Sequence, residues 1–437
     1  MKTVGKSLRV PHRYYSHVPQ LLSINNYYYR RGGSETVFFE HNRLFEQAGW
    51  NVVPFAMHHP LNEASSWDGH FVADSTDVRS QSGLSKIARA ANAIYSFEAA
   101  RRIRAVVRTS RPDVAHAHNI YHHLSPSVLV ELRRAEIPVV LTLHDLKLAC
   151  PAYKMYSHDQ VCERCRGGAL RNVVKNRCIK DSTAMSALVW LESTLHKFLN
   201  TYRNSVTQFV VPSRFFLTKF AEWGIDTRRF TYVPNSVDVD SLVPDGAPGD
   251  AFVYLGRLVP EKGVDTLVRA AAKARVRLRI VGTGPEELRL RQLAESSGAD
   301  VTFSGYLSGA ALRDAVCTAR AVVVPSQWYE NAPLSIMEAS ALARPVIGAD
   351  IGGIPELIRQ DETGIVFRSG DVDSLVDALI RVDGMPEAAS TRMGQAGRDW
   401  MRSEFSPSAY RDRMLSLYRR QGVASEVRSK DPVALVS

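Results

Sequence analysis

Short apolar runs alternate with helical patterns along most of the chain, and this alternation is the feature that most limits its fold. One series of strand-like runs comprises Leu21–Asn25, Val52–Phe55, Val114–Ala117, Val139–Leu143, Phe209–Val211 and Thr231–Val233. A second series comprises Phe252–Leu255, Leu278–Val281, Val301–Ser304, Ala321–Val324, Pro345–Gly348 and Gly364–Phe367. Helical patterns such as Glu35–Gln47 and Leu124–Ala135 lie between them. Alternation of this kind predicts parallel sheets with right-handed crossovers.

The turn-rich stretch Pro234–Asp238 separates the two series and reads as a linker. A chain of 437 residues has room for two to three domains. We therefore expect an α/β protein with two doubly wound, Rossmann-like domains that face a cleft. The expected boundaries are a basic N-terminal extension at 1–19, a first domain at 20–234 with an insert at 148–182, a second domain at 235–402, a terminal helix at 403–422 that packs back on the first domain, and a tail at 423–437.

The chain carries a net charge of +10, and its basic residues cluster. Residues 86–111 hold seven basic side chains and one acid, and residues 164–180 hold six basic side chains and no acid. Such patches suit phosphates or anionic lipid, whereas no nucleic-acid-binding motif accompanies them. An apolar stripe runs through the first patch at helical spacing, at Ile87, Ala91, Ile94, Phe97, Ala100, Ile103 and Val107. It is compatible both with a membrane surface and with packing onto a sheet.

Glu330 and Glu338 lie eight positions apart, after the strand-like run Ala321–Val324. Glu330 is expected in the loop at the strand's carboxyl end, and Glu338 about two turns into the following helix. Ligands bind at this edge of an open α/β sheet. Carboxylates there can accept hydrogen bonds from sugar or ribose hydroxyls, and the intervening backbone N–H groups can donate. The alternative is a helix with one capping and one solvated glutamate.

Arg257 and Lys262 follow the first strand of the second series. A guanidinium fork and a compact ammonium that converge on one diphosphate would stabilise the negative charge on a departing group. The alternative is an ordinary charged loop.

Two glycine-containing loops follow other strands. Gly32 and Gly33 open a helix for which Ser34 is the expected N-cap, and a helix start of this kind favours phosphate. Gly282 stands in a loop with two of the three glycines of a dinucleotide fingerprint, and Pro285 counts against that motif. We interpret this second loop as a wall against the base.

Histidines end two strands of the first series. His116 and His118 are two residues apart and share one face of their strand, and His144 with Asp145 ends the next strand. His118 is the favoured contact for a sugar or an acceptor. The spacing gives no strong support to a metal site from these histidines.

In order and placement, these motifs resemble those of glycosyltransferase family 4. The resemblance covers residues 21–420 and includes the Gly32–Glu35 loop, His116–His118, Thr142–Asp145, Val233–Asn235, Gly256–Arg257 with Lys262–Gly263, Glu330 with Glu338, and Gly352–Glu356. It implies the two-domain GT-B fold. It also implies transfer of a sugar from a nucleoside diphosphate with retention of configuration and without a catalytic metal.

The resemblance also assigns roles to individual residues. Arg257 and Lys262 would hold the diphosphate, Glu338 the ribose and Glu330 the donor sugar. Backbone N–H groups near Asn331–Leu334 would meet the same sugar, and the expected donor-binding residues of this loop are Asn331, Ala332, Pro333 and Leu334. Gly33 would close over the phosphates from the other domain, and His118 would approach the sugar and the attacking oxygen.

Four cysteines, Cys150, Cys162, Cys165 and Cys178, lie in the insert. Their spacing suits a structural zinc site with four thiolates, and an iron–sulfur cluster or free thiols are the alternatives. The insert directly follows His144 and Asp145 and carries Arg164 and Arg166. We therefore expect it to contribute to an acceptor site or to meet an anionic membrane surface.

The leading hypothesis is a hexosyltransferase that builds a surface polysaccharide or glycolipid on a glycan or lipid-linked acceptor. A membrane-spanning helix needs about 20 apolar residues, and no apolar run in the chain is close to that length. We therefore expect a cytoplasmic protein that lies at the inner face of the membrane. The alternatives are an epimerase or phosphorylase of the same fold, or a non-catalytic nucleotide-binding scaffold.

Overall fold

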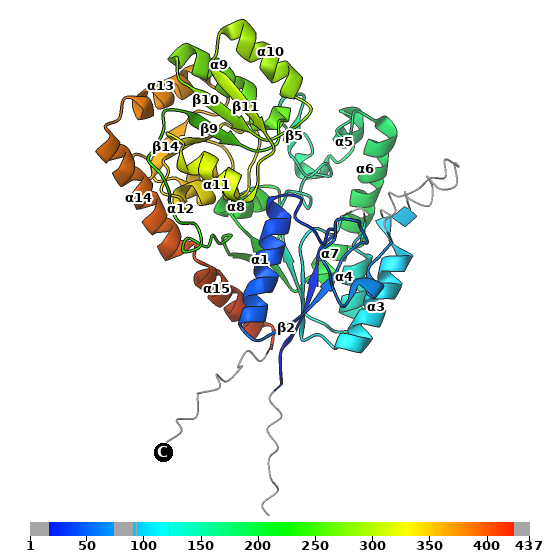
Figure 1. The fold of residues 1–437 in the computed structure, drawn as a ribbon. Coiled ribbons are helices and arrows are strands. Elements are labelled where there is room, and N and C mark those ends of the chain that lie inside the picture. Colours follow the sequence, from blue (N-terminus) through cyan, green and yellow to red (C-terminus); the bar gives the residue numbers. More distant parts are fainter. Residues whose placement is uncertain (1–16, 74–90, 93, 122, 424–437) are drawn as a thin grey trace, which may run out of the picture.

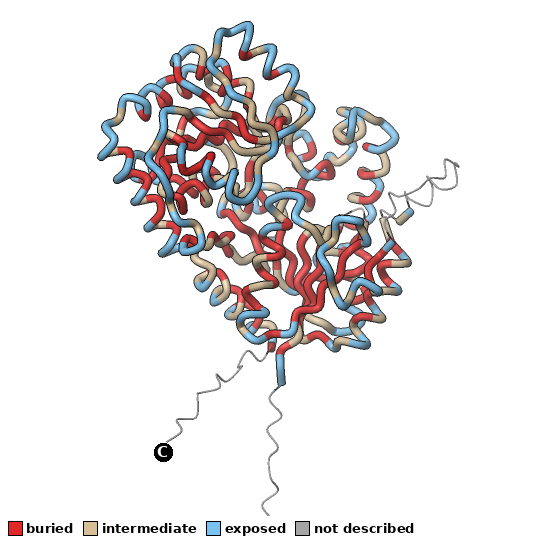
Figure 2. The backbone as a smooth tube through the Cα atoms, in the orientation of Figure 1, coloured by how far each residue is buried: buried red, intermediate tan, exposed pale blue. Residues whose placement is uncertain are grey.

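Two six-stranded parallel sheets form the centres of two domains (Figure 1). The computed structural model describes residues 17–73, 91–92, 94–121 and 123–423. The first sheet has the strand order β2-β1-β3-β4-β7-β8, and the second has the order β11-β10-β9-β12-β13-β14. Helices cover both faces of each sheet, and the central strands are buried (Figure 2). The predicted doubly wound domains are therefore confirmed.

The strand positions follow the apolar runs of the sequence. The first sheet contains β1 Gln20–Ile24, β2 Asn51–Phe55, β3 Val114–Ala117, β4 Val139–Thr142, β7 Gln208–Val211 and β8 Phe230–Tyr232. The second contains β9 Phe252–Leu255, β10 Leu278–Val281, β11 Val301–Gly305, β12 Val322–Val324, β13 Val346–Ala349 and β14 Gly364–Phe367. Strands buried on both faces are apolar throughout, so each run marks its strand to within one residue.

Helices fill the connections between strands. Those of the first domain are α1 Gly33–Gln47, α3 Phe97–Ser110, α4 Ser127–Arg134, α5 Asn172–Lys175, α6 Thr183–Phe198, α7 Thr201–Ser205 and α8 Arg214–Glu222. Beyond them follow α9 Val264–Ala274, α10 Glu287–Ser297, α11 Gly309–Cys317, α12 Leu334–Ala341, α13 Val372–Asp383, α14 Glu387–Glu404 and α15 Pro407–Arg420. The insert adds a small hairpin, β5 Tyr156–Ser157 with β6 Gln160–Val161, which the sequence did not predict. None of the helices in the described residues has the length and apolar character to cross a bilayer.

The apolar stripe predicted as one amphipathic helix is interrupted at Ser96. The Ser96 side chain accepts a hydrogen bond from the Ala99 N–H and caps α3, so the helix begins at Phe97. Phe97 itself is 75% exposed, whereas Ile103 is buried in the core beside the first sheet. The part of the stripe from Ala100 to Val107 thus packs onto the core of the first domain, whereas Ala91 and Phe97 are exposed. Lys86 and Ile87 lie outside the described residues, as does the basic segment 1–16 of the predicted extension.

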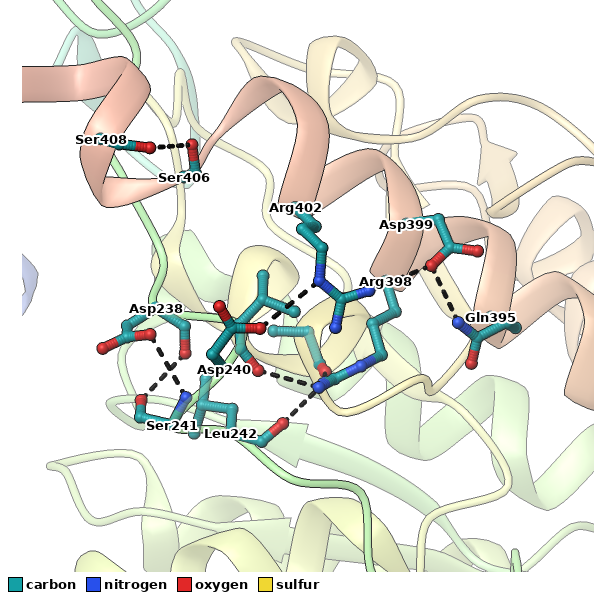
Figure 3. A network of polar contacts seen from close by, with 12 residues as sticks. Asp238, Asp240, Ser241, Leu242, Gln395, Arg398, Asp399, Arg402, Ser406 and Ser408 are labelled. Atoms are coloured by element: carbon teal, nitrogen blue, oxygen red, sulfur yellow. Dashed lines mark hydrogen bonds and ion pairs between the residues drawn. The ribbon is translucent and has the colours of Figure 1, made fainter. Parts of the chain in front are cut away.

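The segment that follows the predicted linker is fixed to α14 (Figure 3). The buried Arg398 guanidinium donates to the carbonyl oxygens of Leu242 at 2.6 Å and Val239 at 2.9 Å, and also to that of Ala341. Arg398 therefore holds this segment against α12 and α14 of the second domain.

The last helix, α15, leaves the second domain and packs on the first. Its Tyr418 is fully buried in a cluster with Phe45 and Trp50. The Tyr418 hydroxyl lies 2.5 Å from His116 Nδ1 and 3.1 Å from His41 Nε2. The C-terminal helix thus ties the two domains together.

We expect Tyr418→Ala to lower the free energy of unfolding of the first domain by about 3 to 5 kcal/mol, because it leaves a cavity and removes one hydrogen-bond partner from each of two buried histidines. Urea unfolding checks this through a lower midpoint. Tyr306→Ala is the matched control, since Tyr306 is 76% exposed and its removal should change stability by less than about 0.5 kcal/mol. Equal effects of the two substitutions would contradict the anchoring role of α15.

Candidate functional site

The order of strands in each sheet shows where a ligand would bind. In the second sheet the chain moves outward from β9 through β10 to β11 and then returns to the other side of β9 at β12. The first sheet reverses in the same way between β1 and β3. A crevice opens at the carboxyl ends of the strands at such a switch point. The loops after β9 and β12, and those after β1 and β3, are therefore the candidate site.

An ion pair joins the two loops of the second domain. The Lys262 Nζ, after β9, lies 2.5 Å from Glu330 Oε1, after β12. The Ser326 hydroxyl donates to the same oxygen at 2.7 Å. The Lys262 ammonium also stands 5.5 Å from the centre of the Trp328 ring. The sequence analysis placed both residues at this edge of the sheet but did not predict this ion pair.

Glu330 is held in its ionised form although it is buried. Burial acts to raise the pKa of this carboxyl, but the charge of Lys262 and the hydrogen bonds from Lys262 and Ser326 outweigh it, so the pKa lies below its usual value. An ionised carboxylate accepts hydrogen bonds only, which suits hydroxyl groups of a ligand.

Arg257, in the loop after β9, and Glu338, on α12, have no polar side-chain partner among the described residues. Among the described residues, the exposed Arg257 guanidinium has no hydrogen-bond or ion-pair partner. Glu338 lies one turn into α12 rather than the expected two turns, because the helix begins at Leu334. Burial raises the pKa of Glu338 to about 7. This half-buried carboxylate likewise has no hydrogen bond or ion pair within the part of the chain that the structure describes.

Glycines allow the neighbouring loops to pack backbone against backbone. A Cβ on Gly282, which has φ of +137°, would stand 1.9 Å from the Gly256 carbonyl oxygen. A Cβ on Gly284 would stand 2.2 Å from the Leu258 carbonyl oxygen. The loop that we interpreted as a wall against the base therefore supports the loop that carries Arg257.

The first domain contributes the start of α1. Gly33 faces Leu334 across the junction, since a Cβ there would lie 3.7 Å from Leu334 Cδ1. The N-cap is Gly32 rather than the predicted Ser34, whose hydroxyl instead bonds the Glu35 carboxylate at 3.1 Å. The first turn of α1 thus presents backbone without a side-chain cap to the second domain.

The loop from Tyr329 to Leu334 also holds the two domains together. Asn331 donates to the Leu143 carbonyl at 3.0 Å and accepts from the Ser213 hydroxyl at 2.8 Å. The Tyr329 hydroxyl donates to Glu163 of the insert at 2.8 Å. The loop that carries Glu330 is thus set partly by the other domain.

Further side chains at this junction were missed by the sequence analysis. The Glu356 carboxylate accepts the N–H groups of Arg214 and Phe215 and thereby caps α8 of the other domain. Lys154 of the insert lies 2.6 Å from the buried Glu261, next to Lys262. The Gly352–Glu356 motif was the one sequence signal for this junction, and the spacing of its residues did not indicate a contact between domains.

Three histidines stack behind the first-domain loops. The rings of His116, His118 and His144 follow one another with centroids 4.7 Å and 5.1 Å apart. His118 Nδ1 lies 2.8 Å from His144 Nε2, while His118 Nε2 is buried with no partner among the described residues. Burial and the neighbouring histidines hold the pKa of His118 well below its usual value, so the ring is neutral.

His116 is part of the core, since it bonds Tyr418 and also Thr142 at 2.7 Å. Burial lowers the pKa of His144 to about 4 and raises that of Asp145 to about 6. These two residues lie beside the site.

The remaining acceptor candidates lie apart in the insert. Arg164 and Arg166 are exposed, and no hydrogen bond or ion pair links them to His144 or Asp145 within the described residues.

The four cysteines of the insert line one small cavity together with Met155 and Val173, and all are free thiols. Burial raises the pKa of Cys150 to about 11 and that of Cys165 to about 12, which favours neutral thiols. Among the described residues no group of three or more metal-ligating side chains stands as a metal site would require. The predicted zinc therefore finds no support in the structure.

Two family models match the chain. Residues 31–241 match "Glycosyltransferase Family 4", and residues 248–400 match "Glycosyl transferases group 1". These matches cover the loops described above in both domains.

Curated relatives match over part of their length. A GDP-mannose-dependent alpha-(1-6)-phosphatidylinositol monomannoside mannosyltransferase of Mycobacterium tuberculosis is 33% identical over 213 residues, 43% of this chain and 55% of that protein. The alpha-D-kanosaminyltransferase of Streptomyces kanamyceticus is 31% identical over 178 residues, 39% of this chain and 46% of that protein. The chain spans about half the length of the curated relatives it matches.

Solved structures share the fold over nearly the whole chain. Sucrose-phosphate synthase from Thermosynechococcus elongatus superimposes with a TM-score of 0.69 at 21% identity, over 93% of this chain and 99% of that one. Anabaena HepE in complex with UDP and glucose gives 0.65 at 16% identity, over 92% and 100%. The fold is therefore GT-B.

Removal of the lysine from the buried Lys262–Glu330 ion pair should change how the protein's stability depends on pH. In Lys262→Met, Glu330 stays buried without a cation, so its pKa rises and the variant loses stability as the pH rises from about 5 to about 8. The loss should reach about 3 to 5 kcal/mol relative to wild type at the upper pH. Urea unfolding across this range measures it.

The double variant Lys262→Met with Glu330→Gln is the control, since it has no charge to bury and should recover much of the loss. A single variant whose stability follows the wild-type pH profile would contradict this account.

Proposed function

Because the chain belongs to glycosyltransferase family 4, we propose that it transfers a hexose-type sugar from a nucleoside diphosphate to a growing glycan or lipid-linked acceptor, in the synthesis of a surface polysaccharide. The observation that carries this proposal is the pairing of Lys262 with Glu330 at the switch point of the second sheet. It puts a cation for phosphate and a carboxylate for hydroxyl groups side by side, as a nucleotide sugar requires.

In this proposal the donor lies across the loops after β9 and β12. The Arg257 guanidinium, free of other partners among the described residues, and Lys262 hold the diphosphate. Glu338 accepts the ribose hydroxyls, and Glu330 accepts a hydroxyl of the sugar. Gly32 and Gly33 close over the phosphates from the other domain, where the open start of α1 favours an anion.

The reaction proceeds on one face of the sugar. The bond between the anomeric carbon and the phosphate oxygen breaks as the acceptor oxygen bonds to the same carbon, and the departing phosphate oxygen takes the acceptor's proton. Configuration is thereby retained without an enzyme nucleophile. The protein supplies positioning and the cations that stabilise the leaving diphosphate. In this proposal the neutral His118 bonds a sugar hydroxyl through its Nε2, which is buried and has no partner among the described residues.

The names of the relatives support the two substrate classes. GDP-mannose and a phosphatidylinositol acceptor occur in the name of the mycobacterial relative, and UDP with glucose is bound in Anabaena HepE. We extend a nucleotide-sugar donor and a lipid-linked acceptor to this chain, and with them a place at the inner membrane face. His144, Asp145 and the insert with its basic Arg164 and Arg166 form the acceptor side.

Removal of either cation should lower turnover strongly. We expect Arg257→Ala and Lys262→Ala each to reduce the release of nucleoside diphosphate from its sugar donor by about 100- to 1000-fold, the loss found when one charge-stabilising donor is deleted. Arg313→Ala, an exposed arginine on α11, is the matched control. Full turnover in either site variant would refute the diphosphate assignment.

The raised pKa of Glu338 makes donor binding depend on pH. Only the ionised carboxylate can accept hydrogen bonds from both ribose hydroxyls, so with a pKa of about 7 affinity for the nucleoside diphosphate should rise about tenfold between about pH 6 and about pH 8. Calorimetric titration at both values measures this change.

Glu338→Gln gives the baseline, because any pH dependence that remains in it belongs to the phosphates. The same pH dependence in both proteins would show that Glu338 does not meet the ribose.

A further inference from the structure

Helix α6 exposes an unusual amount of apolar surface. The described residues contain thirteen large apolar side chains that are well exposed, and five of them lie between Met185 and Leu199. Phe198 is the most exposed of all, at 81%. Scattered apolar side chains are normal on a protein surface, but a concentration on one helix marks an interaction surface. In Figure 1 this helix stands with α5 at the edge of the first domain, away from the second-domain helices.

The apolar side chains form one continuous face. Leu188, Leu191, Leu195 and Phe198 follow each other at spacings of three, four and three, so they lie along one side of the helix. The opposite side is buried and carries Ser186, Val189, Glu192 and His196. Glu192 is the only acid of α6, and it points inward to Lys147 at 2.7 Å. The outward face of α6 therefore carries no negative charge.

Cations lie on α6 and on the segments that flank it in the chain. Helix α5 packs against α6. Between 164 and 203 the chain has eight lysines and arginines against two acids, Asp181 and the buried Glu192. Within the described residues no ion pair involves the exposed members Arg171, Lys175, Arg177, Lys180, Lys197 and Arg203. We call the apolar face of α6 together with these six cations the α6 surface.

We propose that the α6 surface docks this protein on an anionic lipid bilayer. An apolar helix face with unpaired cations on the same and neighbouring segments fits the boundary between lipid headgroups and acyl chains. The cations would meet lipid phosphates there. A second copy of the chain would bring the same cations against each other, so charge complementarity favours the bilayer. The inference rests on the proposed function in one respect: at the docked bilayer the protein would reach its lipid-linked acceptor.

The docked helix is connected to the acceptor side of the site. Lys147, which Glu192 of α6 holds, also bonds the Pro151 carbonyl at 3.0 Å and follows His144 and Asp145 by two to three positions. A bilayer under α6 would therefore lie next to the element that leads into the acceptor loop.

Cosedimentation with vesicles tests the proposal. Wild-type full-length protein should sediment with vesicles that contain phosphatidylglycerol and stay in solution with pure phosphatidylcholine. Substitution of Leu191, Leu195 and Phe198 together by glutamine, and separately Lys175→Glu with Lys197→Glu, should each weaken vesicle binding at least about tenfold. Leu288→Gln with Tyr306→Gln is the matched control, because these side chains are 69% and 76% exposed on the second domain. It should bind vesicles as wild type does.

Three outcomes would overturn the proposal. They are wild-type protein that ignores anionic vesicles, an α6 variant that binds them unchanged, and self-association in sedimentation equilibrium that disappears in the apolar variant without any vesicle binding. Nucleoside diphosphate binding by the wild type and the same variants distinguishes a failure of this proposal from a failure of the proposed function. Retained nucleotide binding shows that the variants are folded. If the wild type itself binds no nucleoside diphosphate, the result counts against the proposed function instead.

Discussion

The buried ion pair between Lys262 and Glu330 is the interaction on which the rest of the site depends. It joins the loops of two strands that neighbour each other in the sheet but are distant in the sequence. A carboxylate that is 8% exposed would otherwise be protonated or expelled, and the lysine would have no fixed direction. The pair therefore keeps Glu330 charged and aims Lys262 at the switch point. Glycine contacts beneath the Arg257 loop and Ser326 beside the carboxylate serve the same geometry.

The same loop couples this geometry to the arrangement of the domains. Asn331, next to Glu330, is bonded by Leu143 and Ser213 of the first domain, and a Cβ on Gly353 would stand 1.8 Å from the Asn331 carbonyl oxygen. Glu356 caps α8 from the opposite side of the junction. A separation of the domains would thus release the Glu330 loop from several partners at once. The geometry of the Glu330 loop therefore depends on contacts with the first domain.

The sequence revealed the features that depend on local pattern. Doubly buried parallel strands appear as apolar runs, and their carboxyl ends meet at one edge, so the strands and the edge at which Lys262 and Glu330 lie were predictable, although their ion pair was not. Contacts between domains were not, because Asn331, Tyr329 and Glu356 find partners more than a hundred positions away. Periodicity also does not show which side of a helix is buried. The stripe at Ile103 faces the core, whereas the face of α6 that carries Leu195 is exposed.

The central claim is that the second-domain switch point binds a nucleoside diphosphate through its phosphates. Calorimetric titration tests this claim most directly. UDP, GDP and ADP, and for comparison the free nucleoside of each, are titrated into the wild type and into Lys262→Met. The account predicts that one diphosphate binds wild type clearly and loses that affinity in the variant, while its nucleoside binds both proteins equally. Binding of no diphosphate, or equal binding of the diphosphate to both proteins, would contradict it.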